Sequence, residues 1–409
     1  MQYRLDKKTG NKLSILGFGC MRFPRNAAVV EAMIMTAIEK GVNYFDTAYI
    51  YPGSEDALGS VLEKHGVRDK VFIATKLPLV YVKTASDFDK FFNQELQRLR
   101  TDMIDYYLMH MLTNEDQWRT LCSLGIENWI AEKKKAGRIR QIGFSFHGSQ
   151  SEFLKLLDDY PWEFCQIQYN YSDENFQAGT VGLKKAAEKG LPVIIMEPLL
   201  GGKLAGGPPR GLPAEAVDLF KKANPALSPA LWGLKWVWDH EEATVVLSGM
   251  SDPKQVEENI GFADACPPHC ITETERETFN KVLEVFNKSY EIRCTGCNYC
   301  MPCPRGVNIP ACFAAYNTRR AMGFFVGMQQ YVTSTTPTSE RHASPSLCVK
   351  CGACEKHCPQ HLPIINNLEI VRKNMEPLLF RVVVAAARKF LGRGKKPKKN
   401  GVTSADGAS

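Results

Sequence analysis

The sequence predicts an α/β chain in two parts, a closed (β/α)8 barrel of the TIM-barrel type followed by a small, mainly helical domain rich in cysteine. Over residues 13–288, short apolar runs alternate with longer charged stretches of helical pattern. Eight such pairs in roughly 280 residues match the usual size of this barrel. After residue 289, cysteine, proline and glycine dominate and no further strand is indicated.

The expected strands are mostly apolar along their whole length, which is typical of parallel strands covered on both faces. They span 15–19, 44–47, 71–75, 104–109, 141–145, 164–169, 193–196 and 244–248. A doubly wound sheet is the rival fold. It would carry a glycine-rich phosphate turn after the first strand, and Gly17-Phe-Gly19 lacks the third glycine.

Helices are expected between these strands, because the intervening segments are charged and have helical periodicity. Examples are 28–40, 88–100, 128–136 and 183–189. Several of them are followed closely by a glycine, as helix ends commonly are (Gly41, Gly137 and Gly190).

Composition divides the chain into a barrel over 1–288, a cysteine-rich domain over 289–375 and a tail over 376–409. The tail is expected to start as a helix over 376–391 and to end in a disordered Gly/Lys/Ser-rich stretch. We expect that helix to pack on the protein. Contact with an anionic membrane surface is the alternative, because the helix is apolar and followed by basic residues.

Charge and hydropathy exclude several classes of protein. Much of the formal charge of +7 comes from the basic tail, so no nucleic-acid-binding stripe is indicated. The chain has no run of 18 apolar residues, the approximate length needed to span a membrane. Its first residues lack the apolar core of a secretory signal, so we expect a cytoplasmic protein.

Eight of the 14 cysteines form two compact motifs, which in a reducing compartment indicates metal rather than disulfides. The first motif is C-x2-C-x2-C-x2-C-P and the second is C-x2-C-x2-C-x3-C-P, the run that bacterial ferredoxins use to bind [4Fe-4S] clusters. The motifs comprise Cys294, Cys297, Cys300 and Cys303, then Cys348, Cys351, Cys354 and Cys358.

Three cysteines at this spacing let one loop reach three corners of a cubane, and in two-cluster ferredoxins the fourth comes from the other motif. We therefore expect a ferredoxin-like domain with two [4Fe-4S] clusters, in which Cys358 completes the first set and Cys303 the second. Cys312 is a spare candidate ligand. Two zinc sites are the alternative, although zinc favours separated Cys-x2-Cys pairs. The clusters suit electron transfer, but they can also serve only to hold the fold.

Four polar residues fall at or just past predicted strand ends, where such barrels carry their active sites. Asp46 ends Asn-Tyr-Phe-Asp, Tyr51 follows five residues later, Lys76 ends Phe-Ile-Ala-Thr-Lys, and His110 ends Asp-Tyr-Tyr-Leu-Met-His. Over residues 1–265 this pattern resembles the aldo/keto reductases, whose Asp, Tyr, Lys and His tetrad has this order. The whole chain resembles members with an appended ferredoxin module.

The resemblance implies a chemistry for this tetrad. A free tyrosine titrates near ~10, and a nearby ammonium favours its phenolate. Lys76, held by Asp46, would activate Tyr51 as the general acid of carbonyl reduction and the base of alcohol oxidation. His110 would orient the carbonyl by hydrogen bonding. Tyr49 competes for the tyrosine role, but its spacing from Asp46 fits less well.

The resemblance also implies contacts to a nicotinamide cofactor. The matching positions are Ser145 and Gln166 for the carboxamide, Pro198, Leu199 and Gly201 along the pyrophosphate, and Gly249, Met250, Gln255, Glu258 and Asn259 around the adenosine. NADP-dependent members carry a Lys-Ser pair and an Arg at the places of Gly249, Met250 and Gln255. Because a 2′-phosphate gains most from an Arg fork, a preference for NADPH over NADH is not expected.

The implied function is an oxidoreductase that interconverts a small carbonyl compound and an alcohol with NAD(P)H. A nicotinamide moves two electrons and each cluster moves one, and flavin is the usual converter between them. A flavin at the barrel mouth is therefore an alternative cofactor, and a ferredoxin-like or other one-electron carrier is the expected partner. The rival hypotheses are an electron-transfer protein whose barrel binds flavin or another cofactor, and a barrel with purely structural clusters.

Overall fold

The computed structural model describes residues 1–207, 211–335 and 343–376. The chain divides into two compact units, and the boundary falls between Lys288 and Ser289. We call the first unit the barrel and the second the module. The predicted basic tail, and all but the first residue of the helix predicted over 376–391, lie outside the described residues.

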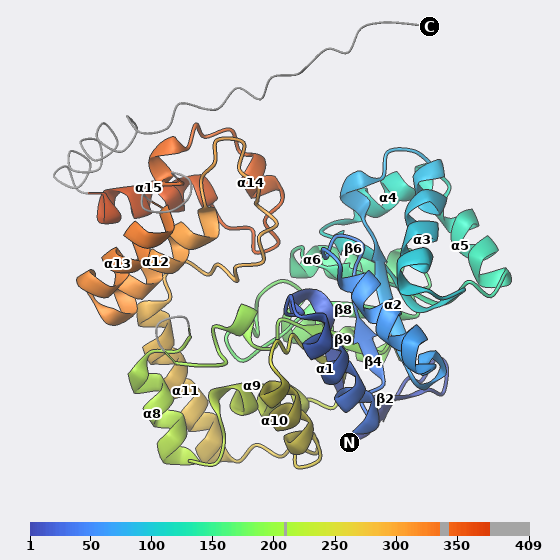
Figure 1. Ribbon diagram of the computed structural model, residues 1–409, viewed down its shortest axis with the longest axis horizontal. Coiled ribbons are helices and arrows are strands. Elements are labelled where there is room, and N and C mark those ends of the chain that lie inside the picture. The colour runs from blue at the N-terminus through green and yellow to red at the C-terminus, as the bar shows by residue number, and fades with distance from the viewer. Residues whose placement is uncertain (208–210, 336–342, 377–409) are drawn as a thin grey trace, which may run out of the picture. The chain divides into compact units, whose positions relative to one another are not determined.

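Eight parallel strands close into a barrel in chain order, so the predicted (β/α)8 fold is confirmed (Figure 1). The strands are β3 (Leu16–Gly19), β4 (Tyr44–Asp46), β5 (Phe72–Leu77), β6 (Ile104–Leu112), β7 (Ile139–Phe146), β8 (Phe164–Gln168), β9 (Val193–Met196) and β10 (Ala243–Ser248). All eight predicted strands form, with ends shifted by no more than about three residues.

Helices follow the strands, and three of the βα units, those of β6, β9 and β10, contain an additional helix. They are α1 (Ala27–Glu39), α2 (Ser54–His65), α3 (Ser86–Leu99), α4 (Glu115–Ser123), α5 (Ile126–Lys135), α6 (Gln150–Asp159), α7 (Gly179–Glu188), α8 (Ala214–Ala223), α9 (Pro229–Trp238), α10 (Pro253–Ala263) and α11 (Glu273–Ser289). The four helices predicted by range appear as α1, α3, α5 and α7.

The interior of the barrel is filled by aromatic side chains from alternate strands. The ring centroid of Tyr106 lies 5.2 Å from that of Tyr44 and 5.1 Å from that of Phe164. Gly17 is also explained by this packing, because a Cβ there would lie 2.6 Å from Val245 Cγ1. The Gly17-Phe-Gly19 sequence therefore lets β3 pack inside a closed barrel, as the absence of a third glycine indicated.

A short antiparallel hairpin, β1 (Tyr3–Leu5) and β2 (Lys12–Ser14), precedes the barrel and was not predicted. It lies at the N-terminal ends of the strands, where the Tyr106 hydroxyl donates a hydrogen bond of 2.8 Å to Asp6 Oδ2. Leu13 packs in the same cluster as Tyr106. The hairpin thus covers the end of the barrel opposite the strand ends that carry the candidate catalytic residues.

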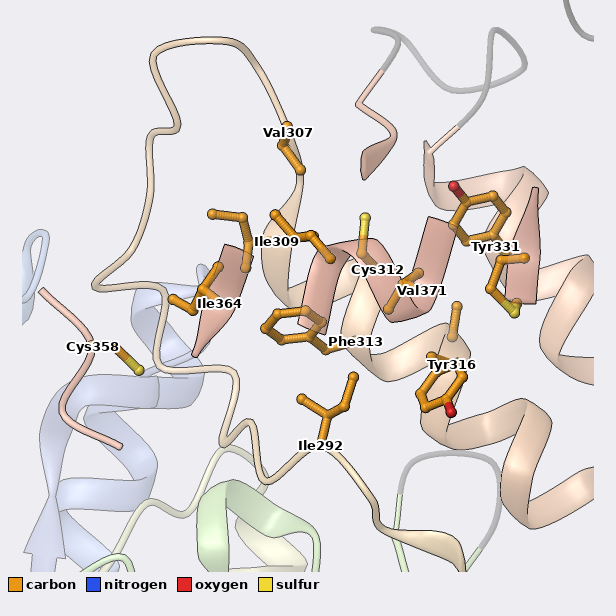
Figure 2. Packing of buried hydrophobic residues seen from close by; sticks show 13 residues of the cluster. Ile292, Val307, Ile309, Cys312, Phe313, Tyr316, Tyr331, Cys358, Ile364 and Val371 are labelled. Carbon is orange, nitrogen blue, oxygen red and sulfur yellow. The ribbon is translucent and has the colours of Figure 1, made fainter. Parts of the chain in front are cut away.

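The module is helical within its described residues. It contains α12 (Ile309–Met322), α13 (Phe324–Thr335), α14 (Ala353–Lys356) and α15 (Ile364–Met375). Figure 2 shows its core, in which Ile309, Phe313 and Ile364 face one another. No described helix of the chain has both the length and the apolar character to cross a membrane.

Candidate active site and cysteine cavities

A buried ion pair joins the ends of two neighbouring strands. Lys76 Nζ lies 2.7 Å from Asp46 Oδ1 and donates a second hydrogen bond of 2.7 Å to the carbonyl oxygen of Thr47. Lys76 is 1% exposed and Asp46 is 4% exposed. A buried charge is tolerated only when it is paired and hydrogen-bonded, so this ammonium is fixed in one position. The Thr47 carbonyl had no signal in the sequence.

Tyr51 lies in the turn between β4 and α2, beside this ion pair. Its ring centroid is 5.4 Å from Lys76 Nζ and 6.0 Å from the His110 ring, which it meets edge-on at 84°. The competitor Tyr49 is engaged elsewhere, because its hydroxyl donates to Gln94 Oε1 over 2.7 Å. The structure therefore brings Asp46, Tyr51, Lys76 and His110 together, whereas the hydroxyl of Tyr49 contacts Gln94 of α3.

The electrostatics of the site keep His110 neutral. Burial, followed by the charges of Lys76 and His147, holds the pKa of His110 well below its usual range. A neutral imidazole donates through one ring nitrogen and accepts through the other. His110 can therefore donate a hydrogen bond to a carbonyl oxygen without adding charge to the site.

The two residues matched to the carboxamide contacts are already hydrogen-bonded within the barrel. Ser145 Oγ accepts from the Met111 backbone N–H over 2.8 Å, and Gln166 Nε2 donates to Asp46 Oδ2 over 2.7 Å. Besides these bonds, a serine hydroxyl can donate its proton and an amide oxygen can accept a hydrogen bond. That pair complements the C=O and NH2 of a carboxamide, so these residues fit a nicotinamide. Gln166 also orients Asp46, which the sequence did not indicate.

The loop after β9 carries Pro198, Leu199 and Gly201, together with an acidic residue that the sequence analysis missed. Glu197 stands directly after β9 and has a left-handed backbone, with φ of 54°. Its Oε2 atom is buried and has no hydrogen-bond partner among the described residues, and burial raises the pKa of its carboxyl. Asp46 and His110 were selected because polar residues at strand ends form the active sites of such barrels, and Glu197 meets the same criterion.

The segment matched to the adenosine contacts lies at the end of β10 and the start of α10. Asn259 is buried, and its Nδ2 donates to Ser248 Oγ over 3.0 Å. Gln255 is exposed, and its Oε1 accepts from the Ser251 N–H over 2.9 Å. Met250 is 1% exposed, whereas Gly249 and Glu258 are exposed. This loop therefore has no cationic fork at the three places where a 2′-phosphate clamp would stand.

The cysteines of the module line two cavities, and each cavity draws on both sequence motifs. Cys294, Cys297 and Cys300 of the first motif line one cavity together with Cys358 of the second. We call it the inner cavity, because Cys358 is buried and apolar side chains such as Phe313 form its walls. Burial and the nearby thiols of Cys294, Cys297 and Cys358 raise the pKa of Cys300 to about 12.

The outer cavity is lined by Cys303, Cys348, Cys351 and Cys354. Its Cys351 is exposed, and Ile309 contributes to the walls of both cavities. Cys312 lines neither cavity; Figure 2 shows it on α12, beside Val371 in the helical core. The structure thus groups the eight thiols in two sets of four, with the fourth cysteines exchanged between motifs.

The donor sets fit clusters better than single ions. Among the described residues, no group of three or more His, Cys, Asp and Glu side chains is arranged to hold one metal ion. Instead, each set of four thiols lines a small cavity of ≈ 20 Å³. Zinc would require four sulfurs about 2.3 Å from one point. Four thiols at the corners of a cavity suit a cubane, whose iron atoms are each bound by one cysteine.

Known proteins match both units of the chain. The model of the Aldo/keto reductase family matches residues 15–267, and that of the 4Fe-4S dicluster domain matches residues 293–362. The first match covers more than half of the chain. The chain therefore belongs to the aldo/keto reductase family and is an oxidoreductase, and its module is a 4Fe-4S dicluster domain.

Individual relatives cover the barrel. The D-galacturonate reductase of Fragaria ananassa is 26% identical over 288 residues, which are 65% of this chain and 85% of that protein. The aldo-keto reductase yakc [NADP(+)] of Schizosaccharomyces pombe is 25% identical over 301 residues, with coverages of 62% and 85%. The apo structure of an aldo-keto reductase from Bacillus halodurans is 26% identical, with a TM-score of 0.55 and coverages of 69% and 96%.

Proposed function

We propose that this protein interconverts a small carbonyl compound and an alcohol with a nicotinamide cofactor, and that its module binds two [4Fe-4S] clusters that exchange electrons with a carrier. The observation that carries the proposal is the buried Lys76–Asp46 pair beside Tyr51 and His110. The name of the Fragaria ananassa relative, a D-galacturonate reductase, supports carbonyl reduction. The name of the Schizosaccharomyces pombe relative supports a nicotinamide.

In this proposal, Tyr51 gives its hydroxyl proton to the carbonyl oxygen during reduction. The Lys76 ammonium stabilises the phenolate that remains, and Asp46 with the Thr47 carbonyl holds that ammonium in place. Neutral His110 donates a hydrogen bond to the same oxygen and orients it. Ser145 and Gln166 would hold the carboxamide of a nicotinamide, which would supply the hydride when bound. In the reverse direction Tyr51 takes the proton back from the alcohol.

The clusters add one-electron chemistry that the barrel residues do not provide. Cys294, Cys297, Cys300 and Cys358 would hold one cluster, and Cys303, Cys348, Cys351 and Cys354 the other. A flavin would explain how a two-electron step in the barrel is connected to them. The rival hypotheses remain an electron-transfer protein whose barrel binds flavin or another cofactor, and clusters that only hold the module together.

The proposal is tested on anaerobically purified protein by measuring iron, sulfide, zinc and flavin, and then carbonyl-dependent NADH and NADPH oxidation. We expect about eight iron and eight sulfide per chain, a reducible EPR signal and turnover of at least one small aldehyde or ketone. Zinc without sulfide would contradict the cluster assignment. Reducible clusters without turnover of any carbonyl compound or alcohol would favour the electron-transfer protein.

A second prediction concerns the choice of nicotinamide. Because Gly249, Met250 and Gln255 provide no cationic fork, we expect NADPH to bind no more tightly than NADH. Gln255→Arg should strengthen NADPH binding about tenfold, since a hydrogen bond to a charged group contributes roughly 1.5–3 kcal/mol. Cofactor fluorescence titration measures this change, with NADH as the internal control. Equal gains for both cofactors would contradict a 2′-phosphate role for this position.

A further inference from the structure

Exposed residues line both cysteine cavities: Asn298 at the inner cavity, and Arg305, Val349 and Cys351 at the outer one. The inner cavity is walled by Thr295, Phe313, Gln360 and Ile364, each no more than 6% exposed. The outer cavity has the exposed Cys351 among its ligands, and Val349, which also lines it, is 56% exposed. A cluster in the outer cavity would therefore have one exposed ligand, Cys351, at the surface, whereas none of the four cysteines that line the inner cavity is exposed.

The backbone and the apolar packing connect these two positions. Lys350 has a left-handed backbone, with φ of 58°, and its N–H donates to Cys348 Sγ over 3.4 Å. This tight turn places Val349 and Cys351 at the exposed rim of the outer cavity. Ile309, which is 1% exposed, lines both cavities, so the two thiol sets have a wall residue in common. An electron that enters at the outer rim would have a short path inward.

The charge around this rim is positive. Arg305 lines the outer cavity and is exposed, and among the described residues it forms no ion pair. The Lys350 ammonium is 63% exposed and pairs with Glu369. Over residues 289–376, nine Lys and Arg stand against five Asp and Glu, whereas residues 1–288 carry 34 against 38. The module is thus the basic unit of the described chain, and an acidic partner is favoured over a basic one.

We propose that the rim formed by Arg305, Val349, Lys350 and Cys351 is the docking surface for an acidic one-electron carrier protein, such as a ferredoxin or a flavodoxin. The proposal rests on the function proposed above, because it requires a cluster in the outer cavity. A small apolar centre with a charged edge suits a transient redox contact, which buries little area. In the transfer itself one electron leaves the reduced carrier and reduces the outer cluster, and no bond is formed or broken.

The test mixes oxidised holoprotein with a reduced acidic ferredoxin in anaerobic stopped flow, without nicotinamide or carbonyl substrate, and follows bleaching of the clusters. We expect the rate to be first order in carrier and to fall as salt is added. Arg305→Glu should lower the second-order rate constant about tenfold or more at low ionic strength. It should weaken carrier binding in calorimetry in the same sense. In 1 M salt, where charges are screened beyond roughly 3 Å, the difference should disappear.

Lys222→Glu is the matched control, because it makes the same charge change at an exposed position of α8 in the barrel. Equal rates for the Arg305 and Lys222 variants, or a wild-type rate that rises with salt, would overturn the proposal. If Arg305→Glu does not retain iron, the rate constant of Arg305→Gln and the salt dependence of the wild-type rate are measured instead. Both should show that removing or screening positive charge slows electron transfer from the carrier. A wild-type protein without iron refutes the proposed function rather than this surface.

Discussion

Tyr51→Phe is expected to lower kcat/KM for carbonyl reduction by roughly 10²–10⁴-fold, the usual contribution of a positioned general acid. The substitution removes only the hydroxyl and keeps the ring that lies 5.4 Å from Lys76 Nζ. We therefore expect the buried ion pair, the fold and the iron content to be unchanged. Steady-state kinetics with the best carbonyl substrate, combined with the visible absorbance of the clusters, measures both effects.

Tyr49→Phe is the control for this experiment. Its hydroxyl contacts Gln94 on α3, and its ring packs 4.2 Å from the Arg98 guanidinium, away from the ion pair. Carbonyl reduction should persist in that variant. Turnover that survives in Tyr51→Phe but is lost in Tyr49→Phe would reassign the proton donor. Turnover that survives in both would remove the tetrad from the mechanism.

Cys358→Ser is expected to remove the inner cluster, and so about half of the iron and sulfide, although Cys358 belongs to the second sequence motif. The reason is that its thiol completes the cavity lined by Cys294, Cys297 and Cys300. Cys294→Ser should produce the same EPR spectrum, because it takes a ligand from the same cluster. Iron and sulfide analysis with EPR of the dithionite-reduced protein measures the effect.

Cys303→Ser and Cys312→Ser complete this comparison. Cys303→Ser should remove the other cluster, since its thiol lines the outer cavity with those of the second motif. Cys312→Ser should leave both clusters in place, because Cys312 lines neither cavity and packs in the helical core. If the spectra of Cys358→Ser and Cys348→Ser were alike while that of Cys294→Ser differed, each motif would hold its own cluster and the exchange would be wrong.

The sequence by itself determined the barrel and its eight strands, because parallel strands buried on both faces are apolar along their whole length. It also placed Asp46, Lys76 and His110 at strand ends, because all strands of a parallel barrel end on one face. The cysteine motifs indicated a two-cluster module, since spacing within one loop is a local property. Each of these patterns consists of residues that are contiguous or regularly spaced in the sequence.

Only the tertiary structure decided which side chains meet across strands and motifs. The bond from Gln166 on β8 to Asp46 on β4, and the Thr47 carbonyl at Lys76, join residues far apart in the sequence that the closed barrel brings together. The exchange of Cys303 and Cys358 was expected from the two motifs, and the cavities group the thiols in that way, but the exposure of Cys351 follows only from how the module folds. Such contacts are set by the closure of the barrel and the folding of the module, and a local pattern does not contain them.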